Sequence, residues 1–150
     1  MPIANYRIKK VTGIRSDLDA KEVTNVDVSS NFTILSVDKK RDADIGDYLL
    51  VNFHFAVTYK PDLGKVEMDG FLWYTDKNMD KIATEKEGRI EIQADALKDI
   101  SSTILRDTLL EAIDVTRKLK LPVPLAMPKV TVKPNEVSFP KASSVPTKNN

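Results

Sequence analysis

The sequence of 150 residues contains no cysteine and a single histidine, His54. Without cysteine, the chain can form no disulfide bond, no thiolate metal site and no cysteine nucleophile. One histidine cannot supply a cluster of imidazole ligands within one chain. We therefore expect no metal site and no cofactor, and we interpret His54 as a strand residue that faces solvent or a subunit interface.

Glycine is scarce, with five residues, and no glycine-rich phosphate loop is present. The acidic pairs Glu85/Glu87 and Asp95/Asp99 follow the pattern of a solvated helix surface. They do not resemble two carboxylates whose pKa values are driven apart for acid–base work. The sequence predicts no catalytic residues, and we do not expect an enzyme.

Long apolar runs and an excess of one charge are also missing. No segment reaches the length of a membrane-spanning helix, and the first residues, MPIANYRIKK, lack the apolar core of a signal peptide. Basic and acidic residues nearly balance, at 23 and 22, and the basic run at 39–41 is followed by two aspartates. We expect a cytoplasmic protein that neither inserts into a membrane nor binds nucleic acid.

The first half of the chain contains alternating apolar and polar residues, which is typical of half-buried strands. The clearest strand covers residues 48–59, and one of its faces is apolar: Val51, Phe53, Phe55, Val57 and Tyr59. We interpret Phe53, Phe55 and Val57 as core residues. The other predicted strands are residues 6–15, 26–37 and 65–75. The sequence KPDLG at 60–64, between the strands at 48–59 and 65–75, suits a hairpin. Four strands joined by short polar turns predict an antiparallel sheet.

The second half of the chain has a helical pattern. Residues 76–88 predict a short helix that ends at Gly88, and residues 89–94 alternate as in an extended segment. Residues 95–120 contain neither proline nor glycine, and one helical stripe is formed by Leu105, Leu109, Ala112, Thr116 and Leu119. Pro122 ends this long helix. An apolar strap, LKLPVPLAMPKVTVKP at 119–134, follows it.

One helix can cover only one face of the sheet, yet the other face is not cleanly polar. Several apolar residues have the opposite parity to the main columns of their strands: Leu35, Val37, Leu50, Ala56, Phe71 and Trp73. Exposed apolar surface is unfavourable by roughly 25 cal/mol per Å², and monomers seldom leave large apolar patches bare. We therefore expect another subunit or a ligand to cover this face, with a homo-oligomer as the first hypothesis.

Three stretches, in this order, resemble the SecB family of export chaperones. DYLLVNFHFAVTYKPDLGKVEMDGFLWYT is similar to the central hairpin of the family, and ILRD at 104–107 stands where the family has an aromatic residue followed by Arg-Glu. LKLPVPLAMPKVTV resembles its signature loop. The resemblance covers roughly residues 4–133. It is the resemblance of a divergent member of the family, and an archaeal-type member is one possibility. We expect a SecB-like domain over residues 1–133 and a flexible tail rich in Pro, Ser and Lys over 134–150.

The resemblance implies an α+β fold, with a four-stranded antiparallel sheet and one long helix packed on one face. It also implies a dimer or a homotetramer of two dimers, and an ATP-independent holdase that binds unfolded polypeptides in apolar grooves, with a role in protein export. The candidate peptide-binding residues are Phe71, Trp73, Met68, Leu121, Val123, Leu125 and Met127. For the strap residues, a lid on the sheet edge is the alternative interpretation; for Phe71 and Trp73, it is a structural role.

Departures from the family pattern narrow these expectations. The chain is near neutral, whereas typical bacterial members are acidic, which argues against delivery to a SecA-type motor. The aromatic-rich loop of the family is replaced by SDLDAKEVT, and its second helix by VKPNEVSFPKASS. Two other function classes stay open, namely a small-molecule-binding or enzymatic domain with a pocket between sheet and helix, and an oligomeric adaptor for a folded partner.

Overall fold

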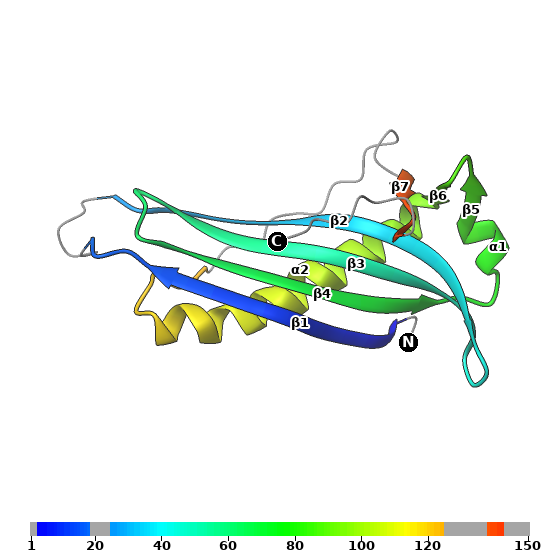
Figure 1. Cartoon of the computed structure of the whole chain (residues 1–150), viewed down its shortest axis with the longest axis horizontal. Helices are drawn as coiled ribbons and strands as arrows, with labels where there is room; N and C mark the ends of the chain where they lie inside the picture. The colour runs from blue at the N-terminus through cyan, green and yellow to red at the C-terminus, as the bar shows by residue number, and fades with distance from the viewer. Residues whose placement is uncertain (1–2, 19–24, 125–137, 143–150) are drawn as a thin grey trace.

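The computed structural model describes residues 3–18, 25–124 and 138–142. Four long strands, β1 (Ile3–Arg15), β2 (Asp27–Asp42), β3 (Gly46–Lys60) and β4 (Gly64–Thr75), form one antiparallel sheet in the order β1-β4-β3-β2. One long helix, α2 (Ala94–Lys118), runs obliquely behind this sheet and contacts all four strands (Figure 1). The predicted α+β fold, with one helix on one face of a four-stranded antiparallel sheet, is confirmed.

The alternation along β3 explains how the sheet buries one of its faces. Every second residue from Leu49 to Tyr59 is buried, and the residues between them are half-buried on the open face of the sheet. Phe53, Phe55 and Val57 are fully buried, which confirms them as core residues. The two-residue period of a strand places this column against α2.

The parity prediction for Val37 was wrong. A register shift between Ile34 and Ser36 inserts one residue, Leu35, into β2. After this bulge the side chains exchange faces, because a strand has a period of two. Val37 therefore pairs with Val51 and is fully buried beneath the helix.

The stripe predicted for the long helix is the face that α2 buries. Leu105, Leu109 and Ala112 are buried among residues of β3 and β4. The helix ends at Lys118, and Lys120 follows with a φ of 56°. The Arg15 guanidinium of β1 donates to the carbonyl oxygens of Leu119 and Lys120, at 3.1 and 2.8 Å. Because these carbonyls have left the helical hydrogen-bond ladder, the contact caps the helix with a residue of the sheet.

The segment between β4 and α2 differs from the predicted short helix. Only α1 (Met79–Ile82) is helical, and the chain then forms an antiparallel hairpin of β5 (Ala83–Lys86) and β6 (Arg89–Ile92). Glu87 and Gly88 have φ values of 53° and 75°. Two consecutive positive φ values are typical of a tight two-residue hairpin turn, so Gly88 serves a turn and does not end a helix. The extended interpretation of residues 89–94 is confirmed for Arg89–Ile92.

A short strand, β7 (Ser138–Pro140), pairs with β6 and completes a second sheet of order β5-β6-β7. This strand lies within residues 134–150, which were expected to form a flexible tail. Phe139 packs against the core cluster near α1, and Figure 1 shows β7 beside β6 and near β2. Residues 134–137 and 143–150 lie outside the described part of the chain.

Candidate functional site

The candidate peptide-binding residues lie on two opposite faces of the sheet. Phe71 and Trp73 are half-buried on the open face, whereas Met68, only 1% exposed, faces α2. Leu121 is buried on the helix side, and Val123 is half-buried close after it. Leu125 and Met127 lie outside the described residues. The structure therefore brings Met68 and Leu121 into one cluster and separates Phe71 and Trp73 from it.

The open face has an aromatic patch at one end. The rings of Tyr48 and Trp73 stack, with centroids 4.5 Å apart and an interplanar angle of 27°. Leu50 is opposite Trp73 in the adjacent strand, and the Lys9 ammonium lies 5.8 Å from the centroid of the Phe71 ring. An aromatic surface with a cation above one ring can contact both apolar and anionic groups. Tyr48 was not among the predicted site residues, although alternation along β3 places it on the same face as Leu50.

The middle of the open face is polar. His54 Nδ1 lies 2.6 Å from an Asp69 carboxylate oxygen, and its Nε2 lies 3.5 Å from Glu67. Lys65 Nζ is 3.0 Å from the same Glu67 oxygen, and this hydrogen bond is the largest cause that lowers the pKa of Glu67. Within the described ranges, no group of three or more His, Asp or Glu side chains has a metal-binding arrangement. We interpret the cluster as a network of partly exposed ion pairs in which each side chain already has a partner.

The helix side carries the beginning of the apolar strap. Leu121 packs so closely that a Cβ on Gly64 would lie 3.0 Å from its Cδ1. The Tyr59 hydroxyl donates a hydrogen bond of 2.6 Å to the carbonyl oxygen of Pro122, and burial raises the pKa of Tyr59 to about 12. Through these contacts, the first residues after α2 are fixed to the ends of β3 and β4. The interpretation of Leu121 as part of a lid is therefore compatible with its place in the structure.

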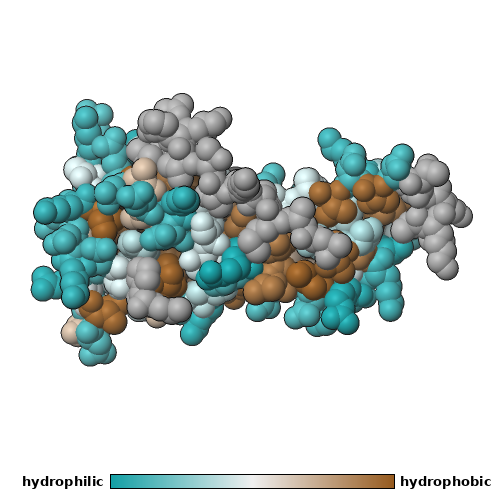
Figure 2. All heavy atoms as spheres, turned by 180° about the vertical axis from the view of Figure 1, so that it is seen from behind, coloured by the Kyte–Doolittle hydropathy of each residue, from teal (hydrophilic) through white to brown (hydrophobic). Residues whose placement is uncertain are grey.

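A rim of incompletely buried apolar side chains surrounds this cluster. These residues pack against it without being fully buried: Ile8, Val26, Val28, Phe32, Val115 and Leu119. Val11, half exposed at 50%, extends the rim along the edge strand β1, where it pairs with Met68. Figure 2 shows apolar side chains gathered on this face, toward the half in which α2 ends. We name these seven residues the helix-side rim. None of these seven residues was predicted to bind peptide; Leu119 was predicted as part of the helical stripe.

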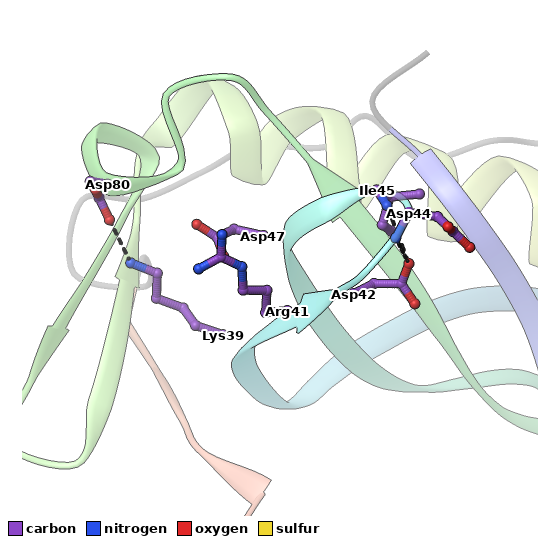
Figure 3. Close-up of polar contacts among 7 residues, drawn as sticks. All are labelled: Lys39, Arg41, Asp42, Asp44, Ile45, Asp47 and Asp80. Atoms are coloured by element: carbon purple, nitrogen blue, oxygen red, sulfur yellow. Dashed lines mark hydrogen bonds and ion pairs between the residues drawn. The ribbon is translucent and has the colours of Figure 1, made fainter.

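A separate hollow of about 370 Å³ lies between the β2–β3 turn and α1, lined in part by Ile45, Asp47 and Asp80. Figure 3 shows two of its acidic side chains, Asp47 and Asp80, with the basic residues beside them. Asp80 pairs with Lys39 at 3.2 Å, and Asp47 lies 3.9 Å from Arg41. Nearby, Asp42 accepts hydrogen bonds from two backbone N–H groups of the turn. These carboxylates serve local structure, and the hollow is not at the sheet–helix interface where a small-molecule pocket was considered.

No helix in the described ranges is long and apolar enough to cross a membrane.

Comparisons with known proteins concern the fold. No protein-family model and no curated protein matches the sequence. Among solved structures, the chain is similar to the Mycobacterium tuberculosis Rv1957 SecB-like chaperone, solved in complex with a ChAD peptide from the Rv1956 HigA1 antitoxin. The TM-score is 0.53 and the sequence identity 13%, over 83% of this chain and 87% of the other. At this identity the likeness shows the fold alone, so this chain has a SecB-like fold.

Proposed function

We propose that this chain is a divergent SecB-like chaperone of the cytoplasm, which holds unfolded polypeptides without ATP and has no catalytic site. The observation that carries the proposal is the helix-side rim, an apolar surface on the covered face of a SecB-like sheet. The neighbour of the same fold was solved with a peptide bound. This supports polypeptide as the class of ligand.

The rim suits a ligand of variable sequence. Its residues are aliphatic or aromatic, and several remain partly accessible around a fully buried floor that includes Met68 and Phe55. Binding that depends on apolar area accepts many sequences, because it needs few directional polar contacts. An unfolded chain supplies apolar side chains at irregular spacing. The rim would therefore hold unfolded segments in general.

The strap and the aromatic patch are the other parts of the proposed binding surface. Leu121 and Val123 would border the rim on the side where α2 ends, and Leu125 and Met127 stay candidates on the sequence alone. Phe71 and Trp73 would form a second contact on the open face, reached by a long client that extends beyond the rim. An extended client can occupy both faces, since unfolded segments wrap large surfaces.

We also propose that the chain forms a homo-oligomer, either a dimer or a tetramer. The edge strand β1 supports this, because Val11 and Ile14 are 50% and 61% exposed on its two faces. A long edge strand with exposed apolar residues is a favourable place for pairing with another chain. Light scattering at micromolar concentration would test this proposal, and the mass of a monomer would contradict it.

The proposed function is tested by aggregation of an unfolded client in the absence of ATP. We expect near-stoichiometric protein to suppress aggregation, and the double replacement V28S and L119S on the rim to weaken it severalfold. The matched control is I45S in the β2–β3 turn, since Ile45 is 40% exposed and lies outside the rim. No suppression at severalfold excess of the wild type would reject the holdase function. Equal activity of the rim and control variants would reject the rim as its site.

A further inference from the structure

Among the described residues, strand β7 is attached to the rest of the protein by contacts of several kinds. Its register pairs Ser138 with Glu91 and Phe139 with Ile90. The Arg89 guanidinium donates to the Ser138 hydroxyl and carbonyl oxygens, at 2.9 and 3.0 Å. Phe139 packs against the core cluster that contains Ile90. β7 therefore occupies the outer edge of β6 with one aromatic side chain and a short backbone ladder.

The ladder of β7 is short for a strand. It covers three residues, and the last of them, Pro140, has no N–H group to donate. Strands in proteins commonly have five or six residues. Much of the attachment must therefore come from side chains, above all from the half-buried Phe139.

The surface around β7 has a definite chemistry. Glu85 of β5 binds the Lys141 ammonium, and the Asp38 carboxylate of β2 accepts a 3.1 Å hydrogen bond from the backbone N–H of Ala142. An apolar contact for an aromatic residue, at Ile90, is thus followed by two carboxylates. Together with the strand edge, these groups fit an extended segment that carries an aromatic residue and, two positions later, a lysine or arginine.

We propose that the outer edge of β6 is a strand-acceptor site for a peptide segment of another protein, and that β7 is its internal occupant. The visiting segment is extended, with an aromatic side chain in the place of Phe139 and a cationic one in the place of Lys141. It binds when β7 leaves, so the affinity of the site is reduced by the fraction of molecules in which β7 is bound. This site lies outside the helix-side rim, and its existence does not depend on the proposed holding function.

The probe is a fluorescein-labelled peptide with this chain's residues 136–142, EVSFPKA, carrying the change P140V to remove the restriction of proline. Its binding to the full chain is measured by fluorescence anisotropy. In the full chain, F139A weakens the internal occupant and leaves the acceptor groups of β5, β6 and β2 in place. We expect F139A to bind the probe at least about threefold more tightly than the wild type, because more molecules have an open site.

A second variant keeps the test independent of core packing. K141E in the full chain removes the ion pair with Glu85 at a partly exposed position, and we expect it to tighten probe binding as F139A does. The matched control I45A should leave the affinity unchanged. A probe that also carries the change F139A should bind more weakly to every form of the protein.

Three results would overturn the proposal. The first is unchanged or weaker probe binding by both F139A and K141E. The second is a probe that binds without shifting the amide NMR signals of Ile90 and Glu91. The third is a larger mass by light scattering for the wild type than for F139A. This result would assign the β6 edge to β7 of a second copy. Suppression of client aggregation without probe binding would reject strand exchange alone, and probe binding without suppression would reject the holding function alone.

Discussion

The replacement G70A tests how closely β1 and the core approach β4. A Cβ at Gly70 would lie 2.6 Å from the Arg7 carbonyl oxygen and 2.7 Å from Cζ of Phe53. The first is a backbone atom of the neighbouring strand, and the second belongs to a fully buried ring. Neither can move without disturbing the sheet or its core. Overpacking of this kind typically costs about 1–3 kcal/mol.

Gly13 offers a matched comparison in the same strand pair. A Cβ there would lie 2.8 Å from Cδ1 of Leu119 and 3.1 Å from Cγ1 of Val115. Both atoms are ends of half-buried side chains, which can rotate away. The alanine would also restrict the unfolded chain, an effect that stabilises by about 0.4–1 kcal/mol where the native backbone accepts it. We therefore expect G13A to be nearly neutral, although the two initial clashes are of similar distance.

Urea unfolding at one fixed protein concentration measures the difference. The single tryptophan, Trp73, stacks on Tyr48 and provides a fluorescence signal for the sheet. With a slope of about 2 kcal/mol per M urea, G70A should lower the midpoint by about 0.5–1.5 M relative to the wild type. Equal losses in G70A and G13A, or a neutral G70A, would refute the argument that a backbone atom makes the clash at position 70 costly.

Three further predictions concern other parts of the molecule. Y59F removes the hydrogen bond to Pro122 and should lower the free energy of unfolding by about 0.5–1.5 kcal/mol in urea titrations. Burial raises the pKa of Tyr59 to about 12. The contribution of Tyr59 to the free energy of unfolding is therefore complete below pH 10 and is lost as the pH rises to about 12. Absorbance titration of Y59F should show one late-ionising tyrosine fewer than titration of the wild type. E67Q removes a carboxyl whose pKa is lowered. The contribution of this carboxyl to the free energy of unfolding is present above the usual carboxyl pKa and is lost as the pH falls through the lowered pKa. Unfolding curves of E67Q should differ by less than about 1 kcal/mol at pH 7 and depend less on pH in acid, and a larger difference at pH 7 would contradict the interpretation of an exposed pair. The double variant F71A and W73A should bind clients severalfold more weakly while its mass by light scattering stays the same, and unchanged affinity would remove both residues from the proposed surface.

Much of the main sheet could be predicted because apolar and polar residues alternate along most of its length. Residues 48–59 and 65–75 each have one apolar column, and both columns are buried in the structure. The same parity separated Phe71 from Met68, so their positions on opposite faces followed from the pattern. At Leu35 an extra residue enters the strand, so the side chains after it lie on the opposite face from the one that alternation predicts.

The candidate binding surface was less predictable, since it depends on what the helix leaves uncovered. Leu119 was recognised as part of the helical stripe, but its partial exposure follows from the oblique path of α2 across the sheet. Val11 lies on the edge strand, and its exposure depends on the order of strands in the sheet. The residues next to Leu119 or Val11 in the sequence do not indicate how exposed either side chain is.

The sequence by itself determined the elements that depend on nearby residues. Period-two alternation specified the strands predicted at 26–37, 48–59 and 65–75, and the stripe from Leu105 to Thr116 specified the face that α2 buries. Only the tertiary structure decided the bulge at Leu35, the β5–β6 hairpin and the pairing of Ser138–Pro140 with β6. The physical reason is that the spacing of apolar residues along the chain determines which face of a strand or helix is buried. Bulges and edge pairings gain their stability from partners tens of residues away.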